Sequence, residues 1–441
     1  MKTETPVVPK KYLSIFIMLV SCFALWGLLN NMTDNLVPAF QRIFGTSQST
    51  AGFVQISFYG SYSVIAVFAS MLIQKRGYRM GVLTGLGVYV LGALLYIPAC
   101  VAQSFWTYIV GIFIVAGGCA VLETTCNPYI LALGDEATAV RRLNFAQMFN
   151  PLGSLAGILL AQQLILGHIH EEISSALFWV CVPYVGLCVI AAVIWIFFFR
   201  SHASEIDRVD EEGGSIKEVL GILAHSPRWY LGVVAQVFYV GVQIAAWTWM
   251  NVYCQKELGV TSQTAASYYL IAITCFIVCR WIATFLMKYV NPAWLMAIFA
   301  AGAVGCSFGV MYIPTEIIFT VGSLPFSWNV IALILMSGFM SLMFPTIYGI
   351  ALGGIDPKAY KIGAAGLIMA IVGGALLTPW MADIIGDASS VFCALTSGFD
   401  STWDEALKLS QMSLRASFIV PAICFAVVLV YSLVFRKNKK A

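Results

Sequence analysis

Apolar runs without a single charged residue dominate this sequence. The longest, from Met80 to Leu122, covers 43 residues without Asp, Glu, Lys or Arg. As one α-helix it would be about 64 Å long, roughly twice the ~30 Å hydrocarbon layer of a bilayer. We therefore predict two membrane-spanning helices in this run, separated by a break near Pro98 to Gln103.

The composition supports the same interpretation over the whole chain. Of 441 residues, 60% are hydrophobic and 10% are charged, whereas soluble domains carry about 25% charged residues. The net charge of +3 is too small to favour a nucleic-acid partner. We predict an all-α membrane protein with twelve transmembrane helices. The predicted spans are residues 12–36, 52–74, 80–100, 104–133, 143–167, 173–199, 229–255, 262–287, 289–314, 326–353, 362–385 and 412–435.

Lys and Arg are concentrated on one side of these spans. By our assignment 19 of the 24 lie on the side of the N-terminus, whereas Arg42, Lys256, Lys408 and Arg415 lie opposite and Arg280 lies inside a span. Cytoplasmic loops carry the excess of basic residues in membrane proteins. Both termini are therefore predicted to be cytoplasmic.

One long polar segment, from Ser201 to Pro227, separates the sixth span from the seventh. It predicts an N-terminal six-helix bundle at residues 1–200, a cytoplasmic linker at 201–227 and a C-terminal six-helix bundle at 228–441. Within the linker, Ser215 and Glu218 form a capping-box pattern before an amphipathic run, which predicts a short helix lying along the membrane surface. A second polar stretch, about 388–408, is predicted to be external, with a short helix starting near Ser401.

The twelve cysteines form no C-x-x-C pair and lie mostly inside apolar runs, so we interpret them as small buried side chains. We expect no metal and no cofactor. His168 and His170 precede Glu171 and Glu172 in a predicted external turn, where a solvated loop is favoured over a metal site.

Two carboxylates fall inside or at the end of predicted spans. Glu123 lies about 6 Å from the middle of its helix, with Asn127 on the same face and Pro128 freeing a backbone carbonyl there. Intramembrane charges are costly and usually functional, although a protonated structural glutamate is the alternative. Asp34 forms a polar patch with Asn31 near the outer end of the first span, where an interfacial position is the alternative.

Amide and aromatic side chains form two further stripes at helical spacing. The members are Asn144, Gln147 and Asn150 in the fifth span, and Gln236, Tyr239, Gln243, Trp247 and Asn251 in the seventh. Interhelical hydrogen bonding would explain some of them. Amides and carboxylates also match sugar hydroxyls, and aromatic rings cover the apolar face of a pyranose. For Arg280, about 12 Å along its helix from Lys288, we expect a structural role with the side chain snorkelling toward the cytoplasm.

On these residues the sequence resembles the major facilitator superfamily, and within it the fucose/glucose-galactose/proton symporter group. The resemblance covers nearly the whole chain. Its motifs are Leu25-Trp26 with Asn30-Asn31-Met32-Thr33-Asp34, Leu122-Glu123-Thr124 with Asn127-Pro128, Arg142-Leu143-Asn144 with Ala146-Gln147 and Phe149-Asn150, Tyr239-Val240-Gly241 with Gln243 and Trp247, and Pro345-Thr346-Ile347. One departure is Phe344, where the fucose pattern has a tyrosine.

The resemblance implies two six-helix bundles that rock about a central site lined by the first, fourth, seventh and tenth helices. It also implies that Asp34 and Glu123 are the proton-coupling carboxylates. With the residue patterns above, the candidate substrate-binding set is Asn31, Glu123, Asn127, Gln147, Asn150, Tyr239, Gln243, Trp247 and Phe344.

The function expected from this is import of a neutral monosaccharide, L-fucose or a related hexose, with a proton as coupling ion. We expect a multi-pass protein of the cell inner membrane, acting as a monomer. A glucose/galactose or N-acetylhexosamine carrier, or sodium coupling, is an alternative within the group. Outside it, the alternatives are a membrane enzyme acting on lipid-linked sugar and a sensor that binds without transport.

Overall fold

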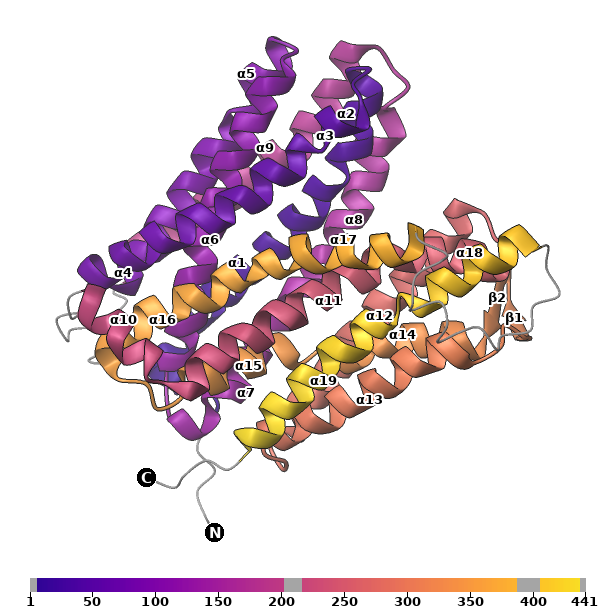
Figure 1. Cartoon of the computed structure of the whole chain (residues 1–441). Coiled ribbons are helices and arrows are strands. Elements are labelled where there is room, and N and C mark those ends of the chain that lie inside the picture. Colours follow the sequence, from indigo (N-terminus) through magenta and orange to yellow (C-terminus); the bar gives the residue numbers. More distant parts are fainter. Residues whose placement is uncertain (1–5, 202–215, 387–404, 437–441) are drawn as a thin grey trace. The chain divides into compact units, whose positions relative to one another are not determined.

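The computed structural model describes residues 6–201, 216–386 and 405–436. The chain forms two compact units, coloured along the sequence in Figure 1. Unit 1 comprises residues 1–229 and 352–369, and unit 2 comprises residues 230–351 and 370–441. The chain passes between the units inside α11 (Pro227–Leu258), at the last residue of α15 (Met343–Leu352), and between α16 (Pro357–Met369) and η5 (Ala370–Val372). The predicted boundaries of the two six-helix bundles, at residues 200 and 228, stay predictions.

Unit 1 is built from helices. They are η1 (Lys10–Tyr12), α1 (Leu13–Asp34), α2 (Leu36–Ile43), α3 (Gln48–Ala51), α4 (Phe53–Leu94), α5 (Tyr96–Val101), α6 (Phe105–Ala132), α7 (Glu136–Gln147), α8 (Phe149–Leu160), the π-helical turn η2 (Ala161–Ile165), η3 (Leu166–His168), α9 (Ile173–Arg200), α10 (Ile216–Ala224) and α16.

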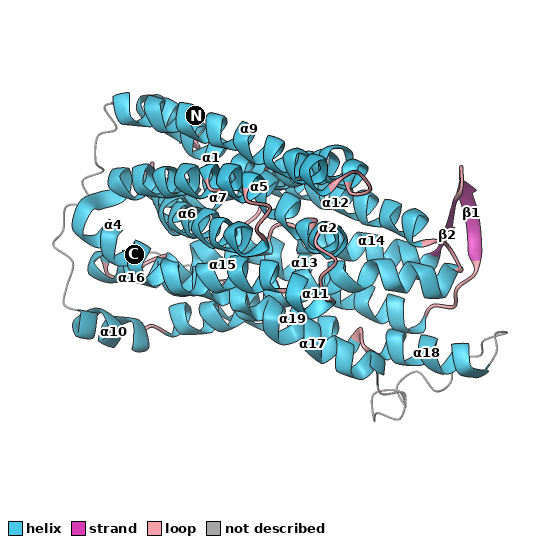
Figure 2. Ribbon diagram, turned by 90° about the horizontal axis from the view of Figure 1, so that it is seen from above, coloured by secondary structure: helices cyan, strands magenta, loops and turns pink. Residues whose placement is uncertain are grey.

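Unit 2 contains helices and one small sheet, seen from above in Figure 2. Besides most of α11, it holds α12 (Ser262–Leu286), α13 (Pro292–Tyr312), β1 (Ile317–Val321), β2 (Leu324–Ser327), α14 (Trp328–Met340), α15, η5, α17 (Gly373–Gly386), α18 (Glu405–Ala416) and α19 (Ile419–Val434).

The predicted twelve spans are confirmed. Eleven helical runs among the described residues are long and apolar enough to cross a membrane. One of them, residues 53–101, contains two spans, because Gly77 has φ 77° and ψ 172° and interrupts α4. Only glycine adopts this backbone conformation readily. The predicted break after Pro98 is also present, since α5 ends at Val101 and Gln103 has φ 49°.

Some predicted helices are interrupted in the structure. The span predicted at 326–353 consists of α14 and α15, and the span predicted at 362–385 extends over α16, η5 and α17. The β1–β2 hairpin, in the stretch between the predicted ninth and tenth spans, has no counterpart in the prediction. In the second polar stretch, residues 388–404 lie outside the described residues, and α18 begins at Glu405.

Glycines let the helices of unit 1 approach at backbone distance. A Cβ on Gly153 of α8 would lie 2.0 Å from the carbonyl oxygen of Ala24 on α1, and a Cβ on Gly27 would lie 2.0 Å from the carbonyl oxygen of Asn150. Such contacts replace the hydrophobic effect as the source of helix association in lipid, where dispersion and close packing dominate. The contact sets the position of α1 against α8.

The short linker helix is confirmed as α10, but its apolar face packs on protein. Val219 and Leu223 are buried against Ala359 of α16, whereas Leu220 is exposed. Glu218 pairs with Lys358 across the same contact at 3.6 Å. The apolar face of α10 therefore has a protein partner in α16, and the expected position of the helix along the membrane surface stays a prediction. Ser215, the predicted cap, lies outside the described residues.

We predict that Gly153→Ala destabilises the protein. The added methyl group would overlap the Ala24 carbonyl, and overpacking of this kind typically costs about 1–3 kcal/mol. The midpoint of thermal denaturation of the purified protein should fall. Gly186→Ala on α9 is the matched control, since a Cβ there meets nothing within 4 Å. Equal midpoints for the two variants would contradict the close α1–α8 contact.

Candidate substrate-binding site

Glu123 is the central polar group of unit 1. It lies on α6 and only 1% of its surface is exposed. Neither carboxylate oxygen has a hydrogen-bond partner among the described residues. Tyr62 of α4 and Cys119, one turn earlier on α6, lie close enough for electrostatic interaction with it. A buried carboxyl group without partners is costly, so it is available to a ligand or a proton.

Two predicted amides join Glu123 in one hydrogen-bonded set. Asn127 donates to the backbone carbonyl of Glu123 at 3.0 Å. Gln147, at the end of α7, donates to the side-chain oxygen of Asn127 at 2.7 Å. The three predicted residues Glu123, Asn127 and Gln147 therefore lie together.

Arg142 fixes the two helices that carry this set. Its guanidinium donates to the carbonyls of Ile130 at 2.7 Å and Leu131 at 2.6 Å, at the end of α6. It also donates to Val7 at 3.1 Å, so the chain before α1 is bound to the same point. Free carbonyls at a helix end need such donors. The middle of α7 is therefore held on the end of α6, and Gln147 follows five residues later as the last residue of α7.

Three further predicted residues lie on the two helices α1 and α8. Asn150 is on α8, and Asn31 and Asp34 are near the end of α1. Asn150 donates to the carbonyl of Phe23 on α1 at 3.4 Å, and Asn31 donates to its own helix at Gly27 at 3.3 Å. Asp34 is the last residue of α1 and is exposed. Its side chain is therefore less enclosed by protein than that of Glu123.

In unit 2 the predicted aromatic residues form two groups along α11. Tyr239 and Phe344 lie with ring centroids 6.4 Å apart, and the Tyr239 hydroxyl is buried with no partner among the described residues. Two turns further on, Trp247 donates to the Ser337 hydroxyl at 3.1 Å and packs edge-on against Phe276. Its indole N–H is thus already used. Gln243 lies between the groups and is half-buried.

Gln236 is a residue that the candidate set omitted. It lies on α11, three residues before Tyr239, and is fully buried. Both its amide nitrogen and its amide oxygen lack partners among the described residues. The sequence did indicate this residue, because Gln236 belongs to the stripe of amide and aromatic residues in the predicted seventh span. Together with Tyr239 it gives unit 2 one amide and one hydroxyl that a polar ligand could satisfy.

The expected snorkelling of Arg280 is wrong. The side chain is 4% exposed, donates from Nε to the carbonyl of Ser341 at 2.5 Å, and lies 4.6 Å from the ring centroid of Phe276. It also lies near Tyr239, with which it interacts electrostatically. A carbonyl and an aromatic face inside unit 2 stabilise the charge, so the side chain has no need to reach water.

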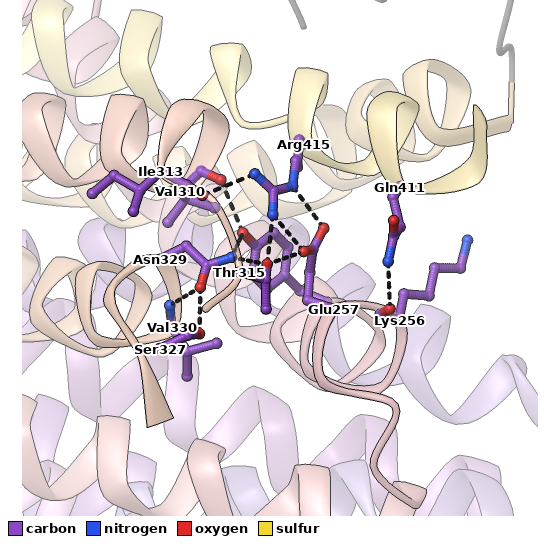
Figure 3. Close-up of polar contacts among 11 residues, drawn as sticks. Lys256, Glu257, Val310, Ile313, Thr315, Ser327, Asn329, Val330, Gln411 and Arg415 are labelled. Carbon is purple, nitrogen blue, oxygen red and sulfur yellow. Dashed lines mark hydrogen bonds and ion pairs between the residues drawn. The ribbon is translucent and has the colours of Figure 1, made fainter. Parts of the chain in front are cut away.

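The end of α11 beyond these residues is fixed by a buried ion pair, shown in Figure 3. Arg415 of α18 donates to both carboxylate oxygens of Glu257, at 2.8 and 2.5 Å. It also donates to Thr315 at 2.6 Å and to the carbonyl of Ile313 at 2.9 Å. Asn329 extends the network by donating to Thr315 at 2.7 Å. The sequence prediction counted Arg415 among the basic residues on the side opposite the termini; in the structure its side chain is fully buried.

In the loop before α9, His168 lies 2.6 Å from Glu171 and stacks on Trp179 at 4.2 Å between ring centroids. Hydrogen bonds from His168 and from Ser175 lower the pKa of the Glu171 carboxyl. The imidazole therefore has an acid and an aromatic ring as neighbours.

Twelve apolar spans define a multi-pass membrane carrier, and they bury a carboxyl group, an amide and a hydroxyl that have no partners within the described part of the chain. A family model described as the Major Facilitator Superfamily matches residues 13–379. The chain belongs to the Major Facilitator Superfamily.

Individual relatives agree with this assignment. The chain is 37% identical to the L-fucose-proton symporter of Haemophilus influenzae over 96% of this chain and 97% of that protein. It is 31% identical to the L-fucose-proton symporter of Escherichia coli, over 96% and 93% of the two chains. A crystal structure of the superfamily transporter FucP in the outward conformation matches with a TM-score of 0.82 at 28% identity, covering 97% of this chain and 100% of that one.

We predict that Arg415→Met strongly destabilises the protein. It leaves the Glu257 carboxylate buried without its cation, a loss that typically costs about 3–5 kcal/mol. The denaturation midpoint should drop far more than in the control Arg42→Met, where the arginine is exposed.

The double variant Arg415→Met/Glu257→Met should lose less stability than the sum of the two single variants, because no unpaired charge remains. Strict additivity, or an Arg415→Met midpoint equal to that of the control, would contradict a buried pair.

Proposed function

We propose that this protein is a proton-coupled symporter that imports a neutral monosaccharide, L-fucose or a related hexose, through the cell inner membrane. Both termini lie in the cytoplasm and the working unit is a monomer. The coupling ion is a proton, and no other cofactor takes part. The observation that carries the proposal is the buried Glu123 carboxyl group with two free oxygens beside the Asn127–Gln147 amide pair. The similarity to L-fucose-proton symporters supports the choice of substrate and ion.

The two candidate carboxylates, Glu123 and Asp34, have different surroundings, and we assign them different roles. Glu123 is buried among neutral groups, where an ionised carboxylate is poorly solvated, so it binds sugar hydroxyls or a proton. Asp34 is exposed at the end of α1 and can exchange a proton with water. Asn31 lies one turn before Asp34 on α1. It links the protonation state of Asp34 to the position of α1, which packs on Asn150.

Unit 2 also has side chains that are suited to a sugar, on Tyr239, Phe344 and Gln236. The rings of Tyr239 and Phe344 are suited to the apolar face of a pyranose, and the Gln236 amide and the Tyr239 hydroxyl to its hydroxyl groups. Phe344 itself offers no hydroxyl. We therefore assign sugar selectivity in part to this position, with Gln243 and Trp247 further along the same helix.

Substitution of the two carboxylates separates their roles. Asp34→Asn, which mimics the protonated acid, should keep sugar binding and sugar exchange but lose uphill uptake driven by a pH gradient. Glu123→Ala removes an acceptor, and hydrogen bonds to an ionisable group contribute about 1.5–3 kcal/mol, so sugar binding should weaken about 10- to 150-fold. Both variants are measured in proteoliposomes for binding, exchange and gradient-driven uptake.

Glu172→Gln is the control, since this carboxylate is exposed in the loop before α9 and should leave all three activities unchanged. Normal uphill uptake by Asp34→Asn would remove the coupling role of Asp34. Unchanged sugar affinity in Glu123→Ala would remove Glu123 from the binding site.

The substrate and the ion are tested by uptake of labelled L-fucose under a pH gradient, with unlabelled D-glucose, D-galactose and N-acetylglucosamine as competitors. Accumulation of a neutral sugar excludes both a sensor and an enzyme, because only a carrier concentrates its ligand. Uptake driven by a sodium gradient at constant pH would show that sodium is the coupling ion in place of the proton. Transport of a sugar phosphate with no competition from neutral sugars would overturn the proposal.

A further inference from the structure

The hairpin between α13 and α14 presents an apolar surface outside the spans. β1 and β2 pair antiparallel, with Phe319 opposite Phe326 and Val321 opposite Leu324, around a turn at Gly322 with φ 59°. Figures 1 and 2 both place the hairpin at the end of the helices of unit 2. Every residue of β1 is exposed. We call its four apolar residues, Ile317, Ile318, Phe319 and Val321, the hairpin surface.

The other side of the hairpin is already packed against unit 2. Phe326 is buried and lies edge-on against Tyr268 of α12, and the Tyr268 hydroxyl donates to the carbonyl of Pro325 at 2.5 Å. Phe319 stacks on Phe326 with ring centroids 5.0 Å apart. The position of the hairpin is therefore fixed by α12, and the hairpin surface is apolar area left over after this packing.

The hairpin surface continues the lipid-facing surface of the neighbouring spans. Tyr312 ends α13 and is 49% exposed, and Trp328 begins α14 and is 59% exposed. Phe308, one turn before Tyr312, is exposed as well and stacks on it. Aromatic side chains at the ends of spans mark the boundary between hydrocarbon and water. β2 ends at Ser327, directly before Trp328, so the hairpin starts at that boundary.

The charge pattern and the backbone polar groups of the hairpin indicate how deep in the bilayer it lies. No charged residue occurs from Ile317 to Trp328, and the nearest charge is the exposed Glu316 directly before β1, which suits a position at the headgroups. The outer edge of a two-stranded sheet keeps unpaired N–H and C=O groups, which hydrocarbon cannot satisfy. Headgroups and interfacial water can satisfy them. The suitable environment is therefore the layer where headgroups meet the acyl chains.

We infer that the β1–β2 hairpin is a membrane-interface anchor whose hairpin surface lies among the headgroups and upper acyl chains of a phospholipid leaflet. Nine spans precede it, so the leaflet is the one opposite to the chain termini. The partner is the lipid bilayer itself. The anchor fixes the ends of α13 and α14 at a defined depth, a role separate from sugar binding.

A fluorescent label at Val321 tests the anchor. The variant Val321→Cys, in the full chain with Cys393→Ser, is labelled with NBD and reconstituted in phosphatidylcholine/phosphatidylglycerol liposomes. The described native cysteines are buried or half-buried, and their labelling is subtracted with the parent protein. His170→Cys, on an exposed loop of the same leaflet side, is the water control, and Leu335→Cys, exposed on α14, is the hydrocarbon control.

The Val321 label should emit at shorter wavelength than the His170 label. Spin-labelled lipid with the nitroxide high on the acyl chain should quench it several-fold more strongly than lipid with the nitroxide near the chain end, and Leu335 should show the opposite order. Retained sugar uptake by each variant shows that it is folded. Emission and quenching equal to those of His170 would overturn the anchor.

Two other possible occupants of the hairpin surface would give different results in these measurements. A second copy paired along β1 would protect the label from every spin-labelled lipid and would allow bifunctional maleimide to crosslink Val321→Cys into dimers. Residues 387–404 lying over the hairpin would protect the label from lipid without dimers. Either result overturns the proposal.

Discussion

Gly153 and Gly27 bring the backbones of α8 and α1 into direct contact, and the placement of the polar groups on these two helices follows from that contact. Asn150 reaches the carbonyl of Phe23 only because the two helices touch. In lipid no hydrophobic force pulls helices together, so steric fit at small residues takes that role. The same contact carries Asn31 and Asp34, whose helix cannot shift without affecting α8.

The buried polar groups of the two units differ in whether they have hydrogen-bond partners. Arg142 and Arg415 are both buried, and each makes several hydrogen bonds to groups within its own unit. Glu123, Gln236 and Tyr239 are equally buried, yet their terminal polar atoms have no partners among the described residues. Burial alone would class all five together. The unsatisfied groups are those that a ligand with several hydroxyls can stabilise.

The sequence was sufficient for the spans, because they depend on a local pattern, whereas the membership of the site stays a prediction. Charge-free length predicted twelve helices, and helical spacing placed Asn127 beside Glu123. Long-range partners could not be predicted. Glu257 and Arg415 are 158 residues apart and each lies near the end of a span, where a charge is ordinarily solvated, so only the folded chain shows that they are buried together. The β1–β2 hairpin was missed because most of it lies in the short connection between the predicted ninth and tenth spans, to which the sequence patterns assigned no secondary structure.

The docking of α10 on α16 changes what joins the two units. The polar linker leaves α9 in unit 1 and returns to α10 in unit 1, so the connection to unit 2 begins only within α11, after Trp229. Trp229 is itself held, since its indole donates to the carbonyl of Gly363 at 2.9 Å. The chain crosses between the units twice more, at Leu352 and after Met369, but at this first crossing it is a continuous helix held to α16 by Trp229. The stretch of α11 that leads to Gln236 and Tyr239 therefore starts from a backbone position that α16 fixes.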